Sequence, residues 1–88
     1  MLEKVKLSLR VTATAFDAEI ESLIASALLD IEVAGIDSGV SDPLVERAVI
    51  TYCRLNFGSP EDYDRLKRSY DEQKAQLQMA TGYGLRGE

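Results

Sequence analysis

Apolar residues recur at helical spacing over residues 17–35, the clearest amphipathic segment of the chain. The apolar positions are three or four residues apart: Ile20, Leu23, Ile24, Ala27, Leu28 and Ile31. Asp17 suits the N-cap, Thr14 precedes it by three residues as in a variant of the capping box, and Gly35 can take the positive φ that ends a helix. The pattern predicts a helix that begins near Asp17 and stops before Gly35.

Residues 42–57 are apolar around most of a helical circumference. Asp42 and Pro43 have the character of an N-cap and a first helical residue, and Gly58 can end the helix. At about 100° per residue the apolar arc takes in Leu44, Val45, Ala48, Val49, Ile50, Tyr52, Cys53, Leu55 and Phe57. The polar strip consists of Arg47, Thr51 and Arg54. A helix of this kind must be covered on nearly every side.

Two further helices flank these segments. A helix is predicted from Pro60 to about residue 80, with an apolar stripe that is interrupted at Gln73: Tyr63, Leu66, Tyr70, Leu77 and Ala80. At the N-terminus, Leu2, Val5 and Leu9 favour a short helix over a strand. Together the patterns predict an all-α fold, a small bundle of three main helices plus a short N-terminal helix. We expect a single domain over residues 1–88, with the glycine-rich residues 81–88 as a flexible tail.

The composition is that of an ordinary globular protein. Hydrophobic residues make up 45% of the 88 residues and charged residues 28%. The net charge of −5 disfavours sequence-independent DNA binding, because DNA phosphates repel an acidic surface. The N-terminal stretch lacks the apolar centre of a signal peptide, and no run approaches the roughly 20 apolar residues that cross a bilayer. We therefore expect a soluble protein without a membrane partner.

Candidate catalytic chemistry is sparse. The chain has no histidine, which removes the commonest general base and zinc ligand, so we expect no catalytic, cofactor-binding or metal-binding residues. Acidic pairs such as Asp62 with Asp64 are better explained as a solvated helix face than as a cation site. Cys53, the only cysteine, lies in the apolar arc and is expected to be a packing residue rather than a nucleophile.

Arg47 and Arg54 are candidate subunit-interface residues. They are two turns apart on the polar strip, where they either pair with carboxylates of the same chain or donate across an interface. The width of the apolar arc leaves two similar alternatives: the rest of the domain covers it completely, or a neighbouring subunit supplies part of the cover.

The order of helix signals resembles a known family. The stretches "LRVTATAFDAEIESLIASALLDIE", "DPLVERAVITYCRLNFG" and "SPEDYDRLKRSYDEQKAQLQMATGYG" follow one another as in the head-tail connector, or DNA-packaging adaptor, proteins of tailed bacteriophages. The similarity extends from about Val5 to Gly84 and rests on the spacing of helix starts and ends.

The resemblance implies a structural protein without cofactors. It implies a ring of about a dozen copies beneath the portal of the capsid, joined below to another connector or a tail protein, with DNA passing through without specific binding. The protein would be part of the virion at the head-tail junction and be assembled in the cytoplasm of a bacterial host. In such a ring, Arg47 and Arg54 would meet acidic residues of the next copy such as Asp30 or Glu32.

A small regulatory or DNA-binding helical protein is the alternative. In that case the helices over residues 17–35 and 42–57 would form a pair like a helix-turn-helix. A recognition helix is normally basic, whereas residues 42–57 offer only Arg47 and Arg54. The sequence therefore favours the connector.

Overall fold

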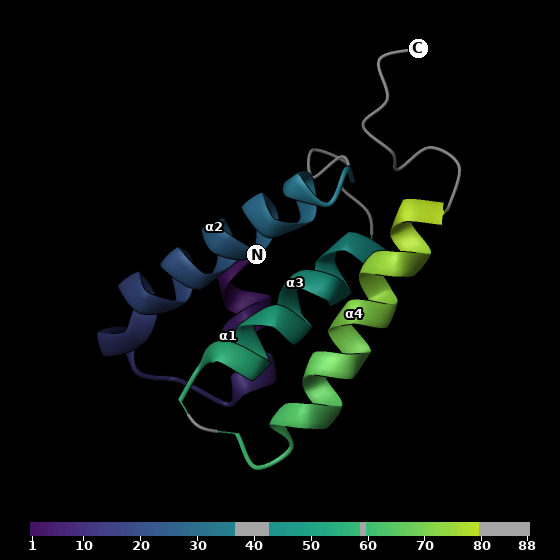
Figure 1. Ribbon diagram of the computed structural model, residues 1–88. Coiled ribbons are helices and arrows are strands. Elements are labelled where there is room, and N and C mark those ends of the chain that lie inside the picture. The colour runs from purple at the N-terminus through teal and green to yellow at the C-terminus, as the bar shows by residue number, and fades with distance from the viewer. Residues whose placement is uncertain (37–42, 59, 80–88) are drawn as a thin grey trace.

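The computed structural model describes residues 1–36, 43–58 and 60–79, and every regular element in these ranges is helical (Figure 1). In chain order the elements are α1 (Leu2–Leu9), a short 3₁₀ turn η1 (Thr14–Phe16), α2 (Asp17–Val33), α3 (Pro43–Asn56) and α4 (Tyr63–Met79). The predicted all-α bundle of three main helices and a short N-terminal helix is confirmed.

Helix α3 is the centre of the bundle. It packs against α4, α2 and α1, and Figure 1 shows it between α2 and α4. The buried side chains of α3 are Val45, Ala48, Val49, Cys53 and Leu55. They meet Ile20, Ala27 and Ile31 of α2, Val5 of α1 and Leu66, Tyr70 and Leu77 of α4 in one hydrophobic core. The apolar arc of α3 is thus the surface against which the other three helices pack.

Helix α2 ends in a Schellman motif, as its glycine predicts. Gly35 has a φ of +86°, and its N–H donates to the carbonyl of Glu32 over 2.9 Å. The N–H of Ile36 donates to the carbonyl of Ile31 over 3.2 Å, and both isoleucine side chains are fully buried. These two hydrogen bonds and the apolar contact between positions C3 and C″ define the motif.

Helix α1 ends in the same way without a glycine. Arg10 has a left-handed backbone with φ 58° and ψ 40°, and its N–H donates to the carbonyl of Leu7. The N–H of Val11 donates to the carbonyl of Lys6 over 3.0 Å. A non-glycine residue in this conformation carries a steric cost of roughly 1 kcal/mol.

The start of α2 differs from the sequence prediction in its capping. Asp17 is the first residue of α2 rather than its N-cap, the N-cap Phe16 makes no side-chain cap bond, and Thr14 opens the 3₁₀ turn η1 instead of a capping box. The carboxylate of Asp17 is drawn to the nearly buried ammonium of Lys6, which lies 2.7 Å away on α1. An ion pair between two helices has replaced the local cap.

The starts of the last two helices were predicted with unequal success. Pro43 is the first residue of α3, as expected, and the predicted N-cap Asp42 lies outside the described residues. Helix α4 begins at Tyr63, three residues later than the predicted start at Pro60. The carbonyl of Asp62 accepts the first helical hydrogen bond, from Leu66 over 2.9 Å, so Asp62 holds the cap position. The expected tail at 81–88 lies outside the described residues.

Candidate assembly surfaces

The apolar arc of α3 is covered by its own domain along most of its length. Ile50, Tyr52 and Phe57 are half-buried against the core that the other arc residues form. Leu44, at the start of α3, is the exception, with 52% of its surface exposed. Of the two alternatives for this arc, the structure therefore favours cover by the chain's own domain, because α1, α2 and α4 cover all but its first turn.

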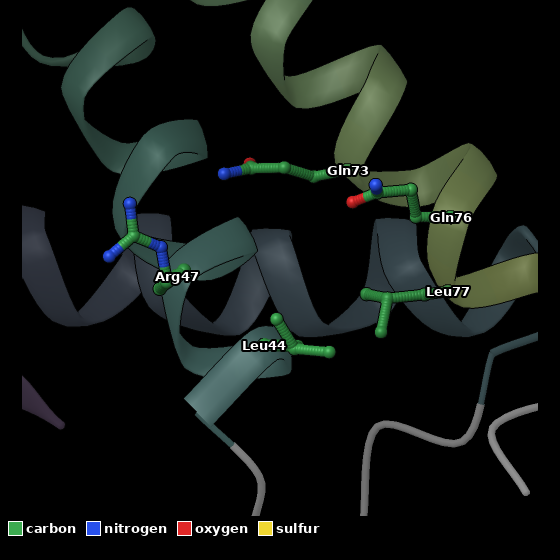
Figure 2. Close-up of a pocket in the computed structure, with 5 residues that line it drawn as sticks. All are labelled: Leu44, Arg47, Gln73, Gln76 and Leu77. Carbon is green, nitrogen blue, oxygen red and sulfur yellow. The ribbon is translucent and has the colours of Figure 1, made fainter. Parts of the chain in front are cut away.

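A hollow of about 430 Å³ opens where the first turn of α3 lies beside the end of α4. We call it the α3–α4 groove; the described residues that line it are Leu44, Arg47, Gln73, Gln76 and Leu77. Figure 2 shows Leu44 and Leu77 directed toward each other, Arg47 on the α3 wall and Gln73 reaching across from α4. The groove therefore combines an apolar floor with one cation.

The polar strip of α3 is confirmed. Arg47 and Arg54 are both exposed, and with Thr51, Ile50 and Ser8 they line a second, shallower hollow between α1 and α3. Arg47 borders both hollows. The structure thus brings together the two arginines that were predicted as interface residues.

Helix α2 carries a second apolar face that the sequence analysis missed. Ala18, Ser22, Ala25, Leu29 and Val33 follow one another at helical spacing, and all five are exposed. Leu29 and Val33 have 62% and 79% of their surfaces in solvent. We call these five residues the outer strip of α2. The spacing was visible in the sequence, but alanine and serine occur on buried and solvated faces alike, so the strip did not stand out.

The flanks of the outer strip are acidic. Helix α2 contains five carboxylates, Asp17, Glu19, Glu21, Asp30 and Glu32, and no basic residue. Glu32 is exposed next to Val33, at the end of the strip. An apolar strip with acidic edges therefore stands on the side of α2 that faces away from α3.

Asp30, the other predicted acidic interface residue, already holds α2 to α4. Its carboxylate accepts hydrogen bonds from the Tyr70 hydroxyl over 2.6 Å and from the Lys74 ammonium over 3.1 Å. Partial burial works to raise the pKa of Asp30, but these two hydrogen bonds and the Lys74 charge outweigh it and hold the pKa below 3.8. Burial and the bond to Asp30 raise the pKa of Tyr70. The structure thus uses Asp30 within the chain.

Cys53 lies inside the core rather than in a reactive environment. Its side chain is fully buried, and burial raises the pKa of the thiol to about 11. A thiol of this kind is almost wholly protonated at neutral pH and is a poor nucleophile. The packing role predicted for Cys53 is confirmed.

Within residues 1–36, 43–58 and 60–79, no three of the metal-ligating residue types gather at one point. No helix in the described part of the chain has the length and apolar content to span a bilayer.

Fold and surfaces together define a small helical protein whose notable exposed features are the outer strip of α2 and the α3–α4 groove. The family model described as "Phage connector protein" matches residues 1–84. The chain therefore belongs to the phage connector protein family, as its resemblance implied. No curated protein and no solved structure matches the chain.

Membership of this family has direct consequences. Phage connectors are typically structural rather than enzymatic components of the virion. The family also implies contacts with phage portal or tail proteins and self-association.

Proposed function

We propose that the chain is a head-tail connector subunit that forms a ring of about a dozen copies beneath the portal, and that DNA is packaged and ejected through this ring. The ring would join the portal to a further connector or a tail protein. The family match over residues 1–84 carries the proposal. The chain would act as a single connector domain and join the virion in the cytoplasm of the bacterial host.

The charge of the chain supports a role in DNA passage rather than DNA binding. A net charge of −5 gives DNA phosphates little to hold, and the counterion release that drives tight binding needs many lysines and arginines. A lumen that holds DNA weakly lets it slide.

The regulatory alternative has less support from the structure. In a helix-turn-helix arrangement α3 would enter the major groove, yet α3 is the central helix of the bundle and packs against α1, α2 and α4. On its exposed side α3 offers only Arg47 and Arg54 as basic residues.

Reconstitution with the portal tests the proposal. The purified chain is mixed in excess with the portal protein of the same phage, separated by size-exclusion chromatography and viewed by electron microscopy. We expect an added ring on one end of the portal and a matching rise in mass. A portal that elutes unchanged at saturating chain concentration contradicts the connector assignment. A shift of duplex DNA by the chain at low ionic strength would instead favour the regulatory alternative.

A further inference from the structure

We propose that the outer strip of α2 on one copy seats in the α3–α4 groove of the next copy, and that this head-to-tail contact closes the connector ring. The inference rests on the proposed ring and names the two surfaces that build it. The occupant of the groove is thus a second copy of this chain.

The shapes of the two surfaces are complementary. Leu29 and Val33 project from α2 one turn apart, about 6 Å along the axis, and both are largely exposed. The groove offers them the exposed side chain of Leu44, with the nearly buried Leu77 at its base. The rest of the strip consists of Ala18, Ser22 and Ala25. Such small side chains allow two helices to approach closely, because the distance between helix axes depends on the side chains at the contact.

The charges of the two surfaces are also complementary. Arg47 is the single charged residue among the described residues that line the groove. Helix α2 has no cation, two of its five carboxylates are paired within the chain, and Glu32 lies beside Val33 on the exposed side. Seating Val33 in the groove brings Glu32 toward Arg47, and Arg54 continues the basic strip along α3. A second α2 brings both an apolar strip and a carboxylate to the groove, whereas DNA would bring negative charge alone.

The two surfaces lie on opposite sides of the molecule. Helix α2 meets the core through Ile20, Ala27 and Ile31, and the outer strip is about 180° around the helix from them. Arg47 and Leu44 are on the exposed side of α3. Two different surfaces on opposite sides of a molecule cannot both meet in one two-fold pair of copies. They join the copies head to tail instead, and a small rotation from each copy to the next closes the chain of copies into a ring. A ring of about a dozen copies needs about 30° per step, so nearly opposite surfaces suit it.

Cysteine crosslinking in the full chain tests the contact. Val33→Cys and Gln76→Cys are introduced together; both positions are exposed, and Cys53 stays in place because it is buried. Mild oxidation at high protein concentration should trap a ladder of dimers, trimers and larger species on a non-reducing gel. The matched control replaces Val33→Cys by Leu7→Cys on α1, where the residue is 80% exposed but outside the strip, and should lose the ladder. A double-cysteine chain that stays monomeric, or a control that ladders equally, overturns the proposal.

A mixing experiment tests the head-to-tail direction. One chain carries Val33→Cys with Leu44→Glu, which spoils its groove, and the other carries Gln76→Cys with Leu29→Glu, which spoils its strip. Each chain alone should give no crosslink, and an equal mixture should give one dimer and nothing larger. Circular dichroism shows that both chains are folded. A dimer from either chain alone, or no dimer from the mixture, overturns the proposal.

Portal binding separates this inference from the proposed function. The chain with Leu29→Glu should fail to form a ring on the portal, whereas Leu7→Glu should form one. If the wild-type chain rings the portal and Leu29→Glu does so equally, the surface assignment is wrong and the connector function stands. If the chains crosslink in a ladder but never bind the portal, the interface stands and the connector function is wrong.

Discussion

Helices α2 and α3 are both rich in apolar residues, yet they differ in how much of that apolar surface the fold leaves exposed. Helix α3 has the wider apolar arc in sequence, and three helices pack around it so that only its first turn remains open. Helix α2 buries one apolar face, and it retains a second apolar strip in solvent. The amount of apolar surface that a helix leaves exposed is therefore decided by its place in the bundle. A central helix uses its whole arc, whereas an edge helix can offer one face to another molecule.

The two faces of α2 should differ most in their effect on stability. Ile31→Ala removes a fully buried side chain and should lower the free energy of unfolding by about 3 kcal/mol, because it leaves a cavity in the core. In a domain of this size that lowers the melting temperature by roughly 15 °C. Urea unfolding followed by circular dichroism measures the change. Val33→Ala, two residues along on the outer strip, should stay within about 0.5 kcal/mol of wild type. Equal losses would show that the outer strip is packed within the chain.

The polar attachment of α2 to α4 should be weaker than its apolar attachment to α3. Tyr70→Phe removes the hydroxyl that donates to Asp30 and should cost about 1 kcal/mol at neutral pH, since the carboxylate is only partly buried. The pKa of Asp30 is lowered in the folded state, so its contribution is complete above 3.8 and is lost as pH falls through the folded pKa. The cost of Tyr70→Phe should therefore shrink in acid. Chemical unfolding at several pH values measures it, and a cost that grows in acid would contradict this account.

The cover that α4 provides for α3 can be improved. The side-chain oxygen of Gln73 is buried and finds no hydrogen-bond partner among the described residues. Gln73→Met keeps the length of the side chain and removes the unsatisfied group, so it should raise the free energy of unfolding by about 1 kcal/mol. The neighbouring exposed residue gives the control: Gln76→Met should change stability by less than about 0.5 kcal/mol. A destabilised Gln73→Met chain would mean that the amide has a partner in solution.

The smallest effect is expected at the end of α1, the third helix that covers α3. Arg10→Gly relieves the left-handed backbone but adds freedom to the unfolded chain, and should raise the free energy of unfolding by about 0.5 kcal/mol. Arg10→Ala retains the strain and should give no gain. Thermal unfolding of the wild-type, Arg10→Gly and Arg10→Ala chains gives the order of their stabilities. An equal gain with alanine and with glycine would rule out backbone strain as the cause.

The sequence predicted the helices well because their signals are local. The spacing of apolar residues predicted all four helices. Pro43 marked the start of α3, and Gly35 marked the end of α2. The failures were non-local. Asp17 had the properties of a cap, but it is paired with Lys6, eleven residues earlier, and no local rule describes that pairing. Helix α4 also starts later than its first proline, with Asp62 in the cap position.

The candidate surfaces were predicted only in part. Arg47 and Arg54 share an exposed strip, as expected, because helical spacing alone places them there. Asp30 was grouped with Glu32 as an acidic residue for a neighbouring copy, yet it bonds to Tyr70 and Lys74, forty or more residues later in the chain. The groove was not predicted, because it exists only where α3 and α4 come together. A single-helix pattern indicates which side chains share a face and leaves open what that face meets.

The lone thiol of Cys53 lies at the heart of the bundle, where reagents in solution meet it only when α3 comes away from its neighbours. The rate at which a maleimide dye labels Cys53 therefore reports how often the bundle opens, and no engineered probe is required. The labelling rate can be compared between mature particles and free chains. A slower rate in the particles would measure how far incorporation into the phage reduces opening of the bundle.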